Sequence, residues 1–241
     1  MPQKRQGRPV GNAQAEIARA FDNPSALAIN KARLEHLDSL GLDLEGKTVL
    51  EVGAGVGHLT GFWEERGCEV VSTEGRNVLA KEHRRRYPHR DVRVMDLDRL
   101  TSYKAFQPFD IVFCYGTLYH VGRPQLVLAN LARLCKELFL LETRVSPIDN
   151  NNVNPVRETD GVNQSLHGMG CRPAKDWLMA ELGKHFPYIY APVSQPDFPD
   201  FVAKWPTVRR KTRAVFVASR QELDLPMLTT ELPMRQEKLQ I

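Results

Sequence analysis

The sequence of 241 residues predicts an α/β fold, in which a mostly parallel sheet carries helices on both faces and ends in an antiparallel hairpin. Short apolar runs alternate with amphipathic stretches from residue 48 to residue 142, and parallel strands need such crossover connections. The first apolar run is followed at once by glycines at alternate positions, as in a strand that turns into a helix beside a ligand. Two more strand-like runs near the C-terminus, joined by a long connection, can pair as the hairpin.

The expected elements follow one another in regular order. Two helices separated by the sequence DNPS are expected between residue 13 and about residue 40. Strands are then expected at residues 48–52, 69–73, 92–95, 109–114, 137–142, 188–193 and 213–219. Helices are expected between them at residues 60–67, 77–87, 124–138 and 173–186, the last with Pro173 in its first turn.

Composition favours one substantial domain, because 42% of the residues are hydrophobic and 26% are charged. The net charge of +4 is compatible with anionic partners, although an ordinary solvated surface is the preferred explanation. We therefore expect a flexible basic arm (1–12), a single domain (13–220) and a loose polar tail (221–241). Within the domain we expect N-terminal helices (13–45), a ligand-binding core (46–143) and two insertions beside a second substrate (144–172 and 194–211).

The cysteines predict neither a disulfide framework nor a metal site. Cys68, Cys114, Cys135 and Cys171 are scattered, with no C-x-x-C pair and no histidine cluster at metal-ligand spacing. No stretch approaches the roughly 18 consecutive apolar residues of a membrane span, and the N-terminal residues lack the apolar core of a signal peptide. We expect a cytoplasmic protein with no membrane contact, and the oligomeric state is left open.

The sequence TVLEVGAGVGHL, residues 48–59, predicts a nucleotide-type pocket. Glu74 ends the next strand, 21 residues after Gly53, where a carboxylate can accept both hydroxyls of a ribose. Asp96 and Leu97 follow the third strand, where an acceptor and an apolar side chain can meet adenine. Glu51 precedes the turn and can organise an ammonium group. Ribose, adenine and an amino-acid ammonium together describe S-adenosylmethionine better than a nicotinamide dinucleotide.

The stretches VLEVGAGVG, TEG, VMDLD and FDIVFCYGTLYHV resemble the successive motifs of class I S-adenosylmethionine-dependent methyltransferases over roughly residues 45–145. The resemblance implies a Rossmann-like sheet of seven strands whose last strand is reversed. It also implies S-adenosyl-L-methionine as the cofactor. The residues that it assigns to the cofactor are Glu51, Gly53, Ala54, Gly55 and Gly57 on the methionine and ribose side, Glu74 at the ribose, Asp96 and Leu97 at the adenine, and Tyr115 and Gly116 near the reactive methyl group.

Methyl transfer from a sulfonium is an in-line displacement, so the protein mainly aligns the reactants, and a base is needed only if the acceptor loses a proton. His120, beyond the fourth strand, is the best-placed base, although a packing histidine would explain it equally well. Tyr119 can line the cofactor or acceptor cavity. His167, in the long loop, is a second candidate base.

A narrower similarity concerns FDIVFCYGTLYH, LFLLETRV and RPAKDWLMAELGKHF, which also resemble the tRNA wobble-uridine carboxymethyltransferase family. In that family the tyrosine of the LYH element contacts a carboxylated cofactor, and Tyr119 matches this tyrosine. We expect no counterpart of that family's long N-terminal extension, and no basic residue can be matched to the one that pairs with the extra carboxylate. We therefore interpret the similarity as kinship and expect the ordinary cofactor.

The first functional hypothesis is a methyltransferase that acts on a polar small-molecule or saccharide-like acceptor, by O- or N-methylation. Phe198, Phe201 and Trp205 would then offer a stacking surface, or else belong to the core. In the second hypothesis RNA is the acceptor, and it would be held by the basic residues at the N-terminus, in 81–93 and in 209–211. The remaining alternatives are an inactive, cofactor-binding partner subunit and a dehydrogenase, which Asp96 and the terminal hairpin disfavour.

Overall fold

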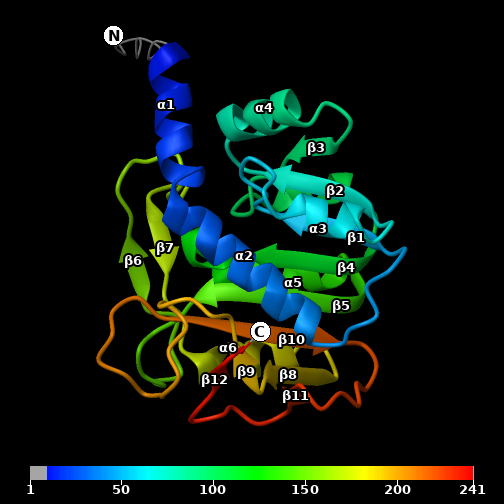
Figure 1. Ribbon diagram of the computed structural model, residues 1–241, viewed down its shortest axis with the longest axis vertical. Helices are drawn as coiled ribbons and strands as arrows, with labels where there is room; N and C mark the ends of the chain where they lie inside the picture. Colours follow the sequence, from blue (N-terminus) through cyan, green and yellow to red (C-terminus); the bar gives the residue numbers. More distant parts are fainter. Residues whose placement is uncertain (1–9, 241) are drawn as a thin grey trace.

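The computed structural model describes residues 10–240, which form a central sheet of eight strands with helices on both faces (Figure 1). The strand order is β11-β8-β10-β5-β4-β1-β2-β3. The strands are β1 Thr48–Val52, β2 Glu69–Glu74, β3 Asp91–Val94, β4 Phe109–Tyr115, β5 Cys135–Arg144, β8 Tyr188–Pro192, β10 Arg213–Ser219 and β11 Leu228–Thr229. Strands β1 to β5 are parallel, whereas β10 runs antiparallel to both β5 and β8. The predicted sheet and terminal hairpin are therefore confirmed, with the two-residue β11 added at one edge.

The strand order reverses at β1, which pairs with β2 on one side and with β4 on the other. The chain connections that follow β1 and β4 run in opposite directions away from each other. A crevice therefore opens between them, beyond the carboxyl ends of β1 and β4. The glycine turn that follows β1 lies at this crevice.

The helices cover the sheet through two separate hydrophobic clusters, because successive residues of β4 face opposite sides. Ile111 and Phe113 pack with α2 and α3, while Val112 and Cys114 pack with α5 and α6. Figure 1 shows α2 crossing one face of the sheet. The helices are α1 Val10–Phe21, α2 Pro24–Ser39, α3 Thr60–Glu64, α4 Asn77–Arg86, α5 Pro124–Arg133 and α6 Lys175–Gly183, with short 3-10 helices η1 Leu100–Ala105 and η2 Leu118–His120.

The segment 144–172 contains a hairpin that the sequence does not predict, formed by β6 Pro155–Arg157 and β7 Met169–Cys171. Its strands are three residues long and lack an apolar run, so periodicity gives no signal for them. The hairpin lies beside the N-terminal helices in Figure 1, at the end of the sheet where the crevice opens.

The tail after residue 220 is not loose, contrary to the prediction. β11 extends the sheet, and β12 Glu237–Lys238 pairs with β9 Ser194–Gln195. Although the tail is polar overall, four of its apolar side chains pack against the core: Leu223, Met227, Leu228 and Leu232. Of the predicted arm, residues 1–9 lie outside the described residues, and α1 already begins at Val10.

The aromatic side chains of the 194–211 insertion belong to the core rather than to a stacking surface. Phe201 and Trp205 are only 1% and 4% exposed, and Phe198 packs against the same cluster as Phe201. Among the helices of residues 10–240, none combines the length and the apolar character that crossing a membrane requires.

Candidate active site

A cavity of about 300 Å³ lies beyond the carboxyl ends of the parallel strands, and the glycine turn forms one of its walls. Gly53 and Gly55 have φ angles of +71° and +57°, a backbone region that residues with a Cβ rarely adopt. A Cβ on Gly53 would lie 2.1 Å from Oγ1 of Thr117. Two of the other residues predicted here, Ala54 and Gly116, also line the cavity. The glycine turn therefore exposes backbone atoms to the cavity, with no side chain between them and a ligand.

Glu74 lines the cavity at the end of β2, as predicted. Its carboxylate accepts hydrogen bonds from the backbone N–H of Gly55 at 3.0 Å and of Arg76 at 2.8 Å. Burial raises the pKa of Glu74, although these hydrogen bonds oppose the effect. The contacts fix the carboxylate against the glycine turn and leave lone pairs for a further donor.

Asp96 and Leu97 also line the cavity, but His167 does not. His167 is half exposed, and its Nε2 lies 3.0 Å from a carboxylate oxygen of Asp96. Asp96, Asp98 and His167 place ligand-type atoms within 4.8 Å of one another. Acidic side chains often gather in this way without a metal, so the absence of a metal site stays a prediction. The structure gives His167 a contact at the predicted adenine side and no support as a base.

Glu51 and Gly57 are not among the residues that line the cavity. The buried carboxylate of Glu51 accepts hydrogen bonds from the hydroxyls of Thr60 at 2.6 Å and Ser72 at 2.7 Å. A Cβ on Gly57 would lie 2.3 Å from Nε2 of His83, so this glycine permits packing between the turn and α4. Glu51 is thus held in an internal hydrogen-bond network, and its role in organising an ammonium group through water or backbone stays a prediction.

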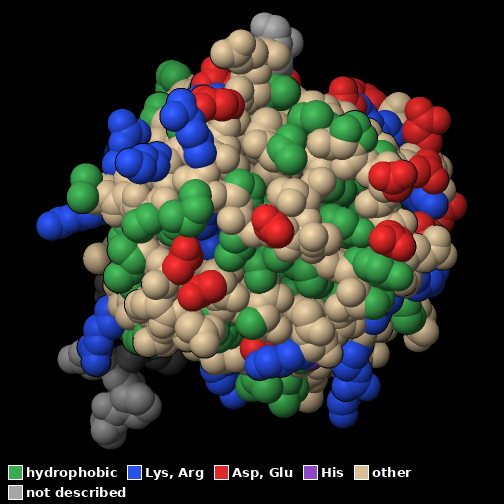
Figure 2. All heavy atoms as spheres, turned by 90° about the horizontal axis from the view of Figure 1, so that it is seen from below, with side chains coloured by type: hydrophobic (Ala, Val, Ile, Leu, Met, Phe, Trp, Pro, Cys, Tyr) green, Lys and Arg blue, Asp and Glu red, His purple; other side chains and the backbone are tan. Residues whose placement is uncertain are grey.

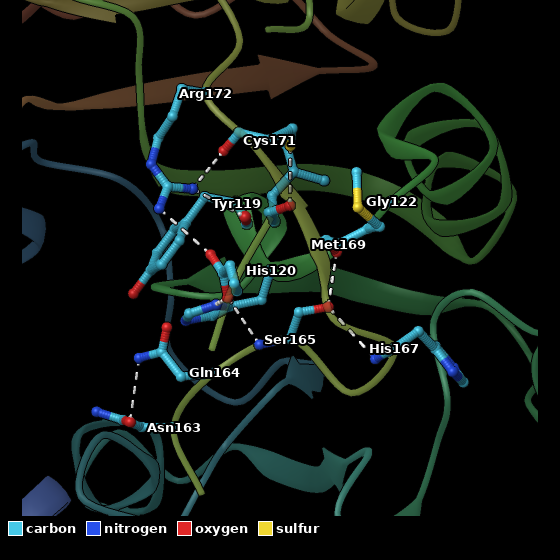
Figure 3. A network of polar contacts seen from close by, with 12 residues as sticks. Tyr119, His120, Gly122, Asn163, Gln164, Ser165, His167, Met169, Cys171 and Arg172 are labelled. Atoms are coloured by element: carbon cyan, nitrogen blue, oxygen red, sulfur yellow. Dashed lines mark hydrogen bonds and ion pairs between the residues drawn. The ribbon is translucent and has the colours of Figure 1, made fainter. Parts of the chain in front are cut away.

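His120 lines the cavity and is held by a carboxylate that the sequence analysis missed. Its Nδ1 lies 2.5 Å from Oε2 of Glu158, a residue that directly follows β6. Glu158 also accepts hydrogen bonds from the backbone N–H of Ser165 at 2.7 Å and from Arg172 at 3.2 Å. Figure 3 shows His120 amid this network, with His167 turned away from it.

The protonation of His120 follows from this geometry. Burial lowers the pKa of His120, and the bond to Glu158 opposes this effect only in part. An ionised carboxylate only accepts hydrogen bonds, so Nδ1 of the neutral ring must carry the proton. Its other nitrogen, Nε2, is therefore left with a free lone pair.

Two arginines lie beside the predicted methyl position. Arg33 and Arg213 line the cavity with Tyr115 and Tyr119, and both are nearly buried. The buried carboxylate of Glu142 accepts hydrogen bonds from Arg33 at 2.6 Å and from Arg213 at 2.9 Å. Arg213 also donates to the hydroxyl of Tyr119 at 3.2 Å. A basic residue therefore does stand beside Tyr119, although none could be matched there from the sequence.

The opposite wall comes from the segment 144–172 and from α1. Asn163, Gln164 and Leu166 of the segment line the cavity, as does Phe21 at the end of α1. Figure 3 shows Asn163 and Gln164 near the hydroxyl end of Tyr119. This part of the predicted insertion thus lies at the cavity, whereas the aromatic residues of 194–211 do not.

Several basic side chains of the run 81–93 are paired with other groups of the protein. Arg86 pairs with Asp22 at 2.8 Å, and Arg90 pairs with Glu64 at 2.6 Å. Arg84 donates to the backbone oxygen of Val92 at 2.9 Å. On the face seen in Figure 2, Lys and Arg side chains lie in separate groups with acidic side chains between them. Neither feature resembles a continuous groove for RNA.

A family model described as "Methyltransferase domain" matches residues 50–137, which hold the glycine turn, Glu74, Asp96 and His120. This part of the chain is thus similar to a methyltransferase domain. The site's chemistry fits S-adenosylmethionine as a cofactor. The glycine turn offers backbone without side chains, a carboxylate is fixed at the end of β2, and within residues 10–240 the buried hydroxyl of Tyr115 has no hydrogen-bond partner.

Curated relatives match about half of the chain. A protein named ubiquinone biosynthesis O-methyltransferase from Bordetella avium is 33% identical over 45% of this chain and 46% of its own length. One of the same name from Hahella chejuensis is 35% identical over 45% of this chain and 46% of its own length. The chain thus spans about half the length of these relatives.

Solved structures share the fold at low sequence identity. The N-terminal domain of EvdMO1, crystallised with SAH and D-fucose, has a TM-score of 0.60 at 20% identity, covering 83% of this chain and 84% of that one. Magnesium protoporphyrin IX methyltransferase from Synechocystis PCC 6803 has a TM-score of 0.54 at 15% identity, covering 90% and 87%. Both structures match 83% or more of this chain, so the fold that they share with it extends beyond residues 50–137.

Proposed function

We propose that the protein transfers a methyl group from S-adenosylmethionine to a hydroxyl oxygen of a polar small molecule. The observation that carries the proposal is the His120–Glu158 pair at the cavity that Glu74 and the glycine turn also line. A hydroxyl must lose its proton as it attacks, and the free Nε2 of His120 can take it. The bound cofactor supplies the electrophilic methyl group and its leaving group.

The other side chains around the cavity would bind the cofactor and the acceptor. Glu74 would hold the ribose, and Asp96 with Leu97 would hold the adenine. Tyr115 and Gly116 would lie near the methyl group, and Tyr119 would form the wall beside the acceptor. Glu158 fixes the ring of His120, so that the proton-accepting nitrogen keeps its position through the reaction.

The choice of a small-molecule acceptor over RNA rests on two observations. Residues of the segment 162–166 and the end of α1 cover part of the cavity, and the arginines Arg86 and Arg90 of the basic run 81–93 are paired internally. The relatives from Bordetella avium and Hahella chejuensis are named O-methyltransferases of ubiquinone biosynthesis, which agrees with transfer to oxygen.

The test uses radiolabelled S-adenosylmethionine and a nuclease-treated pool of small metabolites. We expect label in the small-molecule fraction, and we expect His120→Gln to lower the rate by about 10²–10⁴-fold, the usual contribution of a general base. The variant should still bind S-adenosylhomocysteine as the wild type does. His89→Gln, which changes an exposed histidine, is the matched control. Label that appears only in RNA, or an unchanged rate in His120→Gln, would contradict the proposal.

The pH profile separates a base from a packing residue. Because burial lowers the pKa of His120, the wild-type rate should fall with decreasing pH only below the usual histidine pKa of about 6.5. Glu158 raises that pKa, so Glu158→Gln should shift the midpoint further toward acid and lower the plateau rate. The measurement is the rate at saturating substrate from about pH 4.5 to about pH 8.5, in steps of about half a pH unit. A midpoint that Glu158→Gln leaves in place would show that Glu158 does not act through His120.

A further inference from the structure

Three guanidinium groups surround the ring of Tyr119, and they come from distant parts of the chain. Arg213 at the start of β10, Arg172 just after β7 and Arg144 at the end of β5 lie 4.9, 5.3 and 5.5 Å from the centroid of the ring. We call Arg144, Arg172 and Arg213 the arginine cluster. Figure 3 shows Arg172 beside the ring of Tyr119.

The carboxylates around the arginine cluster neutralise only two of its members. Arg213 pairs with Glu142 at 2.9 Å and lies 3.5 Å from Asp200. Arg172 pairs with Glu158 at 3.2 Å. Within residues 10–240, by contrast, no ion pair forms with Arg144, and its buried Nε has no hydrogen-bond partner. Glu142 also forms an ion pair with Arg33, so its charge is shared between two arginines. The arginine cluster therefore carries an excess of positive charge.

The strand register makes this excess costly. Arg144 and Arg213 are direct partners in the antiparallel pair of β5 and β10, so both side chains lie on the same face of the sheet. Like charges directly opposite each other repel, and partial burial removes water that would screen them. Burial and the charge of Arg213 both lower the pKa of Arg144, yet a guanidinium stays protonated at neutral pH. A bound anion would relieve this repulsion.

We propose that Arg144 and Arg213, with the hydroxyl of Tyr119, bind an anionic group of the methyl acceptor, a carboxylate or a phosphate. The inference rests on the proposed function and narrows its substrate class. Arg213 and Tyr119 line the cavity together with His120, so an anion held there lies on the acceptor side of the base. Guanidinium groups bind both carboxylate and phosphate through paired N–H donors, and this orients the acceptor as well as attracting it.

The test measures thermal unfolding of the full chain at constant ionic strength. Sodium acetate and sodium phosphate replace sodium chloride in separate titrations, with and without S-adenosylhomocysteine. We expect at least one of the two anions to raise the unfolding temperature in a saturable manner, and the arm that responds identifies the preferred group. Arg144→Gln should abolish the shift and should still fold, because it removes a charge that has no partner. Arg133→Gln, which removes an exposed arginine of α5, should retain the shift.

Two results would overturn the inference: no stabilisation by either anion, or an equal shift in the wild type and in Arg144→Gln. The proposed function fails separately, if S-adenosylhomocysteine does not bind. The titrations without that ligand still report on the arginine cluster in that case.

Discussion

Glu142→Gln is expected to destabilise the protein by about 3–5 kcal/mol, the usual cost of removing one partner from a buried ion pair. The side chain of Glu142 is fully buried and lies between two guanidinium groups, those of Arg33 and Arg213, which are themselves 8% and 7% exposed. Glutamine keeps the shape but leaves Arg33 without a counter-ion among the described residues and leaves Arg213 with only Asp200, at 3.5 Å. The measurement is the free energy of unfolding from urea denaturation.

Glu137→Gln is the matched control on the same strand. Glu137 pairs with Lys47 at 2.9 Å but is 45% exposed, so its loss should cost less than about 1 kcal/mol. Burial alone would raise the pKa of Glu142, but the charges of Arg213 and Arg33 outweigh it and hold the pKa below its usual value. A lowered folded-state pKa means that the stabilisation is complete above the unfolded-state pKa and is lost as the pH falls through the folded-state pKa. Equal costs for the two variants at neutral pH would contradict the role given to Glu142.

Gly53→Ala should abolish measurable binding of S-adenosylhomocysteine. The new Cβ would lie 2.1 Å from Oγ1 of Thr117, whose hydroxyl donates to the backbone oxygen of Val52 at 3.1 Å. The turn or Thr117 must move, and either movement displaces backbone that lines the cavity. The measurement is calorimetric titration with S-adenosylhomocysteine, together with the unfolding temperature.

Gly46→Ala separates this clash from backbone strain. Gly46 has a φ of +66°, close to that of Gly53, but a Cβ there would meet nothing within 4 Å. It should cost only about 1 kcal/mol of stability and leave the affinity unchanged. If Gly53→Ala bound S-adenosylhomocysteine as well as Gly46→Ala does, the glycine turn would not be the wall of the cofactor site.

The fold was predictable where local pattern and tertiary structure agree. The apolar run of β1 and the glycines after it are local signals, and the spacing to Glu74 places a carboxylate at the end of the neighbouring strand. The hairpin β6–β7 and the packed tail were missed because short or polar segments show no periodicity. They are held by contacts with the rest of the molecule.

The sequence predicts which residues follow successive strands and line the cavity, but it does not predict the partners of Glu142 and His120. Residues that follow successive strands converge by topology alone, which is why Glu74 and Asp96 were found. The partners of Glu142 lie 109 and 71 residues away in the sequence, and Glu158 is 38 residues from His120. One signal was available: a glutamate inside the apolar run LFLLETR must find a positive partner when the strand is buried.

Titration of S-adenosylhomocysteine into the wild type, Glu74→Ala and Glu69→Ala tests most directly whether this cavity holds the cofactor. Glu69 is an exposed residue of the same strand and serves as the control. We predict a single site in the wild type and in Glu69→Ala, and an affinity about 10–100-fold lower in Glu74→Ala, as expected for hydrogen bonds to a charged group. Equal affinities in Glu74→Ala and the wild type, or no binding to the wild type, would contradict the account.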